Sequence, residues 1–121
     1  MSSLDIYLVE DNPLLALGLK QIIKSLGHRV CGFSASYEQA VFDLQSVKPD
    51  LIITDIMLEG QGTGVDLGQY INKYLKIPFI YQSSVSINHV ICEAYATGPE
   101  AYLVKPVRRY DLGAAISAFG E

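Results

Sequence analysis

Residues 51–57 read LIITDIM, an apolar stretch interrupted by one threonine and one aspartate. Leu51 to Thr54 form a nearly all-apolar run, which is typical of a strand buried on both faces of a parallel sheet. A carboxylate, Asp55, follows the run directly. Such a carboxylate either caps the next element or takes part in chemistry. The residues that gather around Asp55 decide between these two interpretations.

Length and composition indicate one folded domain. The 121 residues suit a single hydrophobic core, so we assign residues 1–121 to one domain. Half of the residues are hydrophobic and 18% are charged, which is the composition of a folded chain and not of a disordered one. The formal charge of −4 argues against direct nucleic-acid binding, which usually requires a basic surface.

The sequence shows no sign of insertion into a membrane. No apolar run approaches the ~18 residues that a membrane-spanning helix needs. The first residues, MSSLDIYLVED, lack the basic stretch and apolar segment of a secretory signal. We therefore expect a cytoplasmic protein without membrane contact.

Two cysteines, Cys31 and Cys92, each follow a histidine by three residues, His28 and His89. These four side chains are of types that bind zinc. In a strand, however, residues i and i+3 point to opposite faces, and His28 and Cys31 lie in an expected strand. Buried structural thiols are therefore favoured over a zinc site.

Short apolar runs alternate with helical patterns along the whole chain. The expected strands cover residues 5–9, 28–33, 50–54, 77–82 and 101–104. Five helices are expected from apolar residues at helical spacing: Leu15, Leu19, Ile22 and Leu26; Ala40, Val41, Leu44 and Val47; Leu67, Ile71, Tyr74 and Leu75; Ile87, Val90, Ile91 and Ala94; Leu112, Ala115, Ile116 and Phe119. This alternation predicts an α/β fold with a parallel sheet covered on both faces. All the strands except the second are apolar enough to be buried on both faces.

Local signals mark the ends of the first two helices. Asn12 can cap a helix that begins at Pro13, and Gly27 can end this helix in a left-handed conformation. Ser36 and Gln39 have the spacing of a capping box at the start of the second helix.

Polar or charged side chains follow four of the five expected strands. Glu10 and Asp11 follow the first strand and Asp55 the third, while Ser83 follows the fourth and Lys105 the fifth. Ligands of open parallel sheets bind outside the carboxyl ends of the strands. We therefore expect these side chains to form one site.

The residue types at this edge indicate a particular chemistry. Three carboxylates repel one another unless a cation joins them, and Mg²⁺ (or Mn²⁺) favours carboxylate and phosphate oxygens. Lys105 and Ser83 are suited to contact phosphoryl oxygens. A carboxylate can also act as a nucleophile and form an aspartyl phosphate. Together these residues describe a site at which one Asp accepts a phosphoryl group.

Four segments resemble the receiver domain of two-component response regulators: VEDNP (9–13), PDLIITDIML (49–58), IPFIYQSS (77–84) and GPEAYLVKP (98–106). The resemblance covers almost the whole chain, with the motifs in family order. It implies a flavodoxin-like fold, in which a parallel sheet of five strands in the order 2-1-3-4-5 is flanked by five helices.

The resemblance also implies the phosphoacceptor and the metal ligands. Asp55 would accept the phosphoryl group. Asp11, Asp55 and the backbone carbonyl of Met57 would bind the metal ion directly. Glu10 would act through a metal-bound water.

Further residues would bind the phosphoryl group or respond to it. Lys105 would pair with the phosphoryl oxygens, and its peptide bond to Pro106 would be cis. Ser83 would hydrogen-bond the phosphoryl group and act as a switch residue together with Tyr102. Met57 and Val85 would flank the path of the attacking water; both are apolar, so we expect slow self-dephosphorylation.

One segment departs from the family pattern. Glu59 stands where the family usually has a proline, and Gly64 lies one residue later than usual. The loop EGQGTG (59–64) is therefore slightly extended, which alters its expected shape and the docking of a kinase. The departure removes no ligand from the site.

The resemblance implies a phosphorylation-dependent signalling switch. A sensor histidine kinase or a phosphotransfer protein would supply the phosphoryl group. Phosphorylation would then change the face made by helix 4, strand 5 and helix 5. That face could serve a homodimer or an output domain of a longer chain. Such a domain assists its own phosphorylation and dephosphorylation but is not a conventional turnover enzyme.

Two alternatives to this switch remain open. A degenerate receiver would act as a constitutive protein-interaction module, and the altered loop is the feature that favours it. The second alternative is a flavodoxin-like ligand-binding or hydrolytic domain. A haloacid-dehalogenase-type phosphatase also uses an Asp nucleophile, but it would need a second Asp two residues further on, where this chain has Met57.

Overall fold

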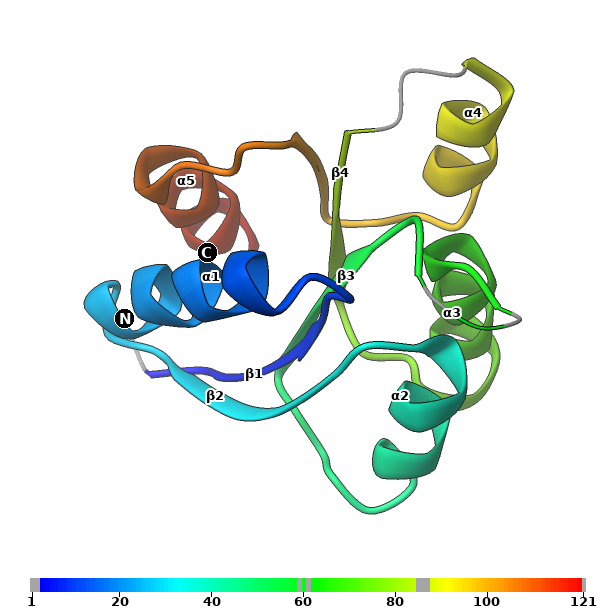
Figure 1. The fold of residues 1–121 in the computed structure, drawn as a ribbon, viewed down its shortest axis with the longest axis horizontal. Helices are drawn as coiled ribbons and strands as arrows, with labels where there is room; N and C mark the ends of the chain where they lie inside the picture. The colour runs from blue at the N-terminus through cyan, green and yellow to red at the C-terminus, as the bar shows by residue number, and fades with distance from the viewer. Residues whose placement is uncertain (1–2, 59, 61, 85–87, 121) are drawn as a thin grey trace.

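The computed structural model describes residues 3–58, 60, 62–84 and 88–120. Strands and helices alternate along the chain (Figure 1): β1 (Asp5–Val9), α1 (Pro13–Ser25), β2 (Arg29–Ser34), α2 (Tyr37–Asp43), β3 (Leu51–Asp55), α3 (Gly64–Tyr70), the π-helix η1 (Ile71–Leu75), β4 (Phe79–Ser83), α4 (Asn88–Ala96), β5 (Ala101–Val104) and α5 (Arg109–Gly120). The strands form one parallel sheet in the order β2-β1-β3-β4-β5. The predicted fold class and strand order are confirmed.

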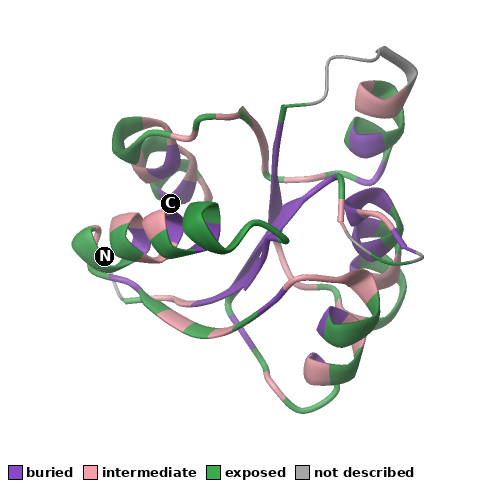
Figure 2. Ribbon diagram, viewed as in Figure 1, coloured by how far each residue is buried: buried purple, intermediate pink, exposed green. Residues whose placement is uncertain are grey.

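Helices cover both faces of this sheet. α1 and α5 lie on one face, whereas α2, α3 and α4 lie on the other (Figure 1). Each face has its own hydrophobic core, and the buried residues concentrate in the central strands (Figure 2). No helix in the described part of the chain is long and apolar enough to cross a bilayer.

The strands confirm most of the burial pattern expected from their apolar runs. All five residues of β3 are buried, as are all five of β4, because each strand has a neighbour on both sides and helices on both faces. The expectation for β5 is wrong: its residues are half-buried, and Val104 is 68% exposed. β5 pairs only with β4 and forms an edge of the sheet, so less of the protein covers it.

The predicted signals at the ends of α1 are confirmed. The Asn12 side chain accepts hydrogen bonds from the backbone N–H groups of Leu14 and Leu15. Gly27 follows the helix with a φ of 91°. The buried face of α1 differs from the expected one, because Ala16, Leu19 and Ile23 are buried while Leu15 is 47% exposed.

The capping box expected at α2 forms only in part. Ser36 Oγ accepts the N–H of Gln39, but the Gln39 side chain donates to Asp43 Oδ1 instead of returning to the helix start. A complete capping box occurs at α3, between Thr63 and Asp66. The pattern of the third helix is also altered: it ends in a π turn, and Tyr74 on that turn is 63% exposed.

The prediction of buried thiols is wrong, because both cysteines are free and exposed. Cys31 lies on β2, an edge strand whose residues alternate in exposure. His28 is buried, and its Nδ1 accepts the N–H of Leu4. Among the described residues, neither cysteine belongs to a group of three or more metal-ligating side chains. The side chain of His89 is outside the described residues.

Candidate functional site

The carboxyl ends of β1, β3 and β5 bring three charged side chains into contact. Glu10 follows β1, Asp55 ends β3 and Lys105 follows β5. Lys105 Nζ lies 2.7 Å from Glu10 Oε1 and 2.5 Å from Asp55 Oδ2. These residues are distant in sequence, so only the parallel sheet brings them together.

This ion-pair cluster is largely shielded from water. Glu10 is 4% exposed and Asp55 is 5% exposed, whereas Asp11 beside them is exposed. Burial raises the pKa of Asp55, although Lys105 opposes the shift by stabilising the ionised carboxylate. For Glu10, burial acts in the same direction, but hydrogen bonds from Lys105 and the Asn12 N–H outweigh it and lower the pKa.

The neighbouring charges also shift the pKa values of Lys105 and Asp11. Burial acts to lower the pKa of Lys105, but its hydrogen bonds to Asp55 and Glu10 outweigh burial and raise it. The pKa of Asp11 is raised by burial and by the neighbouring carboxylates. Lys105 is therefore a cation. Any further positive charge at this edge of the sheet would stabilise the ionised form of Asp11.

Glu10 is fixed by groups from four parts of the chain. Its Oε2 accepts a hydrogen bond from the N–H of Asn12 at 3.0 Å. Its Oε1 accepts hydrogen bonds from Gln82 Nε2 at 3.3 Å and from Lys105 Nζ. Its own N–H donates to the Ser34 carbonyl. Gln82 is a site neighbour that the sequence reasoning missed. A polar side chain inside the otherwise apolar run of β4 was the available signal.

The carboxylates fit a hard divalent cation. Glu10, Asp11 and Asp55 each offer one oxygen, and these oxygens lie within 4.8 Å of one another. Lys105 is the only described cation paired with them, so the group carries excess negative charge. An all-oxygen donor set suits Mg²⁺. Met57 lies next to the cluster, where its N–H donates to Asp55 Oδ1 at 3.2 Å.

The other predicted site residues surround this cluster or connect to it. Ser83 ends β4 and is buried, and its carbonyl accepts the N–H of Lys105 at 3.0 Å. The peptide bond between Lys105 and Pro106 is cis, as the resemblance implies. Tyr102 on β5 is half-buried and stacks against Tyr95 of α4, with ring centroids 5.4 Å apart. Val85 is outside the described residues.

The loop after Asp55 is tied back to the site by its last residue. The N–H of Gly64 donates to the Ile56 carbonyl at 2.7 Å. A Cβ at Gly64 would lie 1.8 Å from the Asp55 carbonyl oxygen, so only glycine fits there. Gly64 therefore lies directly against the backbone of Asp55. Glu59 is outside the described residues.

Comparison with known proteins identifies the family. The family model described as the response regulator receiver domain matches residues 6–117. The phyllosphere-induced regulator PhyR of Methylorubrum extorquens is 30% identical over 118 residues, which cover 93% of this chain and 42% of that protein. The transcriptional regulatory protein YvrH of Bacillus subtilis is 27% identical, over 98% of this chain and 49% of that protein.

Solved structures agree with the sequence comparison. The signal receiver domain of a modulated diguanylate cyclase from Desulfovibrio desulfuricans G20 superimposes with a TM-score of 0.91 at 30% identity, covering 97% of this chain and 93% of that one. The receiver domain of Erythrobacter litoralis PhyR gives a TM-score of 0.81 at 28% identity, with 98% and 90% covered. The chain spans about half the length of the curated relatives that it matches. With the acidic cluster at the predicted edge of the sheet, these matches show that the chain belongs to the response regulator receiver domain family.

Proposed function

We propose that the chain is a phosphorylation-dependent switch in which Asp55 accepts a phosphoryl group. One observation carries this proposal: buried Asp55 ends β3 with one oxygen bound by Lys105 and with two further carboxylates beside it. A carboxylate that only capped a turn would not need a half-buried ammonium and an acidic neighbourhood. The donor would be a sensor histidine kinase or a phosphotransfer protein, and the chain would work in the cytoplasm.

The transfer requires an ionised Asp55. One carboxylate oxygen attacks the phosphorus of the donor's phosphohistidine, an O–P bond forms, and the P–N bond breaks with its electron pair staying on the imidazole. Lys105 favours the ionised nucleophile before transfer and then pairs with a phosphoryl oxygen. Ser83 donates its hydroxyl to another phosphoryl oxygen. The chain assists these steps on itself and is not a turnover enzyme.

A bound Mg²⁺, or Mn²⁺ in its place, would supply positive charge against the phosphoryl oxygens. Asp11, Asp55 and the Met57 carbonyl would hold the ion, with Glu10 acting through a water. Asp11 is suited to this role because it is exposed and has no ion pair within the described residues.

The signal would leave the site through Ser83 and Tyr102. Movement of Ser83 toward the phosphoryl group would shift the balance between two arrangements of the α4–β5–α5 face. In the present arrangement Tyr102 is stacked on Tyr95. A homodimer or an output domain would then read the changed face, and relatives twice as long as this chain support the second possibility.

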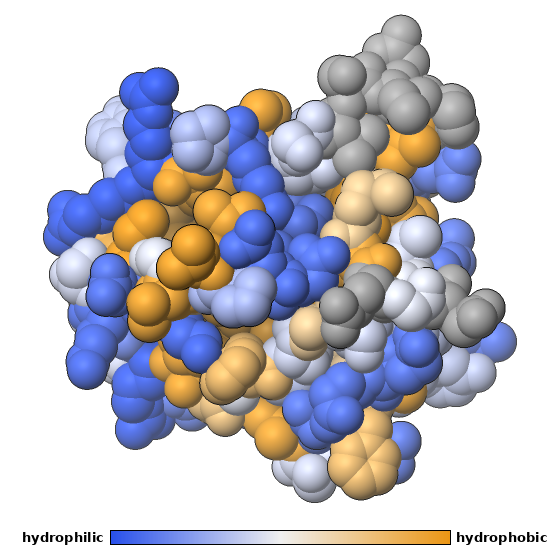
Figure 3. Space-filling model, in the orientation of Figure 1, coloured by the Kyte–Doolittle hydropathy of each residue, from blue (hydrophilic) through white to orange (hydrophobic). Residues whose placement is uncertain are grey.

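An apolar groove beside the site supports docking of a donor protein. The groove has a volume of about 330 Å³ and lies between α1 and the segment that follows β5, with Leu14, Lys105 and Val107 among its lining residues. Leu14 is 79% exposed. Figure 3 shows apolar side chains around a hollow in the region of α1 and α5. A protein that brings phosphohistidine to Asp55 must cover this groove, and burial of the exposed leucines would stabilise the complex.

The test is intact-mass spectrometry after incubation with acetyl phosphate and Mg²⁺. Wild type should gain one phosphoryl adduct and Asp55→Asn none. Because Met57 and Val85 are apolar, the adduct should persist far beyond seconds. An adduct on neither protein, or equally on both, would overturn the proposal and favour a constitutive protein-interaction module.

A further inference from the structure

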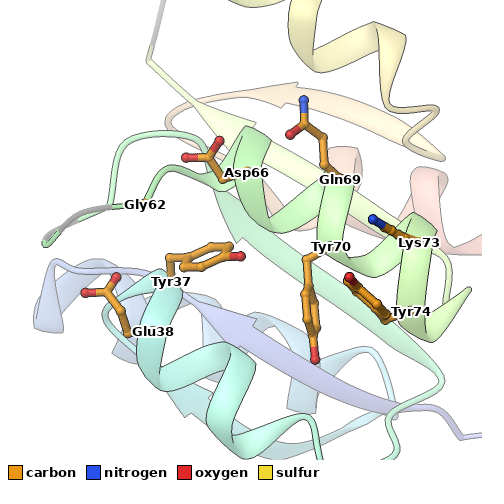
Figure 4. A pocket seen from close by; sticks show the side chains of 8 residues that line it. All are labelled: Tyr37, Glu38, Gly62, Asp66, Gln69, Tyr70, Lys73 and Tyr74. Carbon is orange, nitrogen blue, oxygen red and sulfur yellow. The ribbon is translucent and has the colours of Figure 1, made fainter.

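A second candidate site lies between α2 and the helical segment α3–η1. It is a pocket of about 450 Å³ that shares no lining residue with the acidic edge of the sheet (Figure 4). Its walls carry three tyrosines, Tyr37, Tyr70 and Tyr74, together with the charged side chains of Glu38, Asp66 and Lys73. An open pocket of this size can receive one amino-acid side chain.

The aromatic wall is built from both sides of the pocket. Tyr37 extends from α2 toward Tyr70 on the opposite helix (Figure 4). Tyr70 and Tyr74 lie together, with ring centroids 5.1 Å apart. Tyr74 stands on the π turn η1, and π turns are frequent at functional sites. Gly62 leaves room for Tyr37, because a Cβ there would lie 2.4 Å from the Tyr37 ring.

The charges divide the pocket into two ends. Glu38 and Asp66 lie toward the end at Gly62, whereas Lys73 lies at the opposite end (Figure 4). Neither acid has an ion pair within the described residues. Burial raises the pKa of Tyr37, and the charges of Asp66 and Glu38 add to the shift, so the region around this ring is negative.

One contact inside the pocket already pairs a cation with an aromatic ring. Lys73 Nζ lies 5.3 Å from the centroid of Tyr74. This distance is within the range of a cation–π interaction. Tyrosine ring faces attract positive charge. At the other end, the Glu38 carboxylate, with Asp66 beside it as the acid of the α3 capping box, can hold a second cation away from Lys73.

We infer that this pocket binds the guanidinium group of an arginine side chain on a partner protein. A guanidinium is planar, stacks on aromatic rings and forms paired hydrogen bonds with carboxylates. The pocket offers both kinds of contact, rings in the middle and acids at one end. A neutral side chain would leave the acids without a counter-charge. The inference is independent of phosphorylation at Asp55.

A titration of the isotope-labelled, unphosphorylated chain followed by NMR tests this inference. The probe is the blocked tripeptide Gly-Arg-Gly, and the matched control is Gly-citrulline-Gly, which has the same shape without the charge. A single side chain should bind with a dissociation constant in the millimolar range, with saturable shifts of residues 37, 38, 66, 70 and 74. The citrulline peptide should bind about tenfold more weakly, because it loses both the cation–π and the ionic contact.

Two variants separate the pocket from nonspecific charge. Glu38→Gln and Tyr74→Leu change exposed side chains and should keep the fold while weakening binding, each by about threefold. Glu100→Gln removes an exposed acid outside the pocket and should bind like wild type. Equal shifts with both peptides, equal binding of a Gly-Lys-Gly peptide, or unchanged binding in both variants would overturn the inference.

Discussion

The two faces of the sheet hold their helices by different interactions. On the α1–α5 side, every residue of the buried core is aliphatic. On the α2–α3–α4 side, the core contains Tyr7, Phe79 and Tyr81. The hydroxyl groups of both tyrosines form hydrogen bonds at helix ends. Tyr7 Oη donates to Asp43 Oδ2 of α2 at 2.7 Å, and Tyr81 Oη lies 2.6 Å from Thr97 Oγ1 just after α4.

This difference gives the two faces different properties. Aliphatic burial is non-directional and strong in total, so α1 and α5 are held by the summed contacts of many aliphatic side chains. A hydroxyl bond contributes less energy but fixes the position of one helix end. The tyrosine face also carries α4, which we propose to respond to phosphorylation. On this face the hydroxyl bonds of Tyr7 and Tyr81 add to the buried core and fix the ends of α2 and α4.

The neighbouring residues Ile80 and Tyr81 of β4 point to opposite faces and allow the comparison to be tested within one strand. Ile80→Ala should lower the free energy of unfolding by about 2–5 kcal/mol, because it opens a cavity in the aliphatic core. Urea denaturation measures the change. A cost below about 1 kcal/mol would mean that this core collapses around the deletion and is not tightly packed.

Tyr81→Phe should cost less, about 1 kcal/mol, because the ring stays in place and only the hydroxyl contact is lost. Thr97 keeps its bond to the Ala94 carbonyl. The informative readout is hydrogen exchange, which should become faster for the amides at the C-terminal end of α4 and stay unchanged in α1. Equal exchange in both helices would remove the distinction between the faces.

The tyrosine face should also respond to alkaline pH. Burial raises the pKa of Tyr81 to about 12, with the Thr97 contact opposing the shift. The folded state therefore holds the phenolic proton more tightly than the unfolded chain, whose tyrosines titrate near pH 10. Stability from this group is complete below about pH 10 and should decline between pH 10 and 12. Measured by urea denaturation, the free energy of unfolding of Tyr81→Phe should fall less than that of wild type between about pH 10 and 12. The same pH dependence in both proteins would show that Tyr81 does not cause the loss of stability.

The smallest expected change in stability belongs to the exposed leucines of α1. Leu14→Ser should alter the free energy of unfolding by less than about 0.5 kcal/mol, since the side chain is 79% exposed. Phosphotransfer from a donor protein should nevertheless slow, while labelling by acetyl phosphate should not. Leu17→Ser is the matched control: Leu17 is 52% exposed on the same helix but does not line the groove. Equal slowing in both variants would argue against docking in the groove.

Much of the fold could be predicted from short-range patterns. The run LIIT predicted a buried strand, Asn12 and Gly27 marked the ends of α1, and the alternation of elements predicted a parallel sheet. The acidic edge could be predicted as well, because parallel strands all deliver their carboxyl ends to the same side. Such signals lie within a few residues of the structure that they specify.

The errors arose where exposure depends on neighbours from elsewhere in the chain. β5 and Cys31 looked buried by composition, but both lie on edge strands, which fewer elements cover. Tyr74 has the spacing of a buried helical position, but it lies on the π turn at the end of the helix and is exposed. No local pattern predicts the place of Gln82 beside the site, because its hydrogen-bond partner, Glu10, lies 72 positions away.

The sequence by itself determined the order of the elements, their approximate ends and the polar residues that follow each strand. Only the tertiary structure decided that Lys105 contacts Glu10 and Asp55 together, and that Tyr37 and Tyr70 face one another across a pocket. The physical reason is distance along the chain. Backbone preferences and caps act over three or four residues, whereas ion pairs and pockets form only after the packed sheet has brought distant segments together.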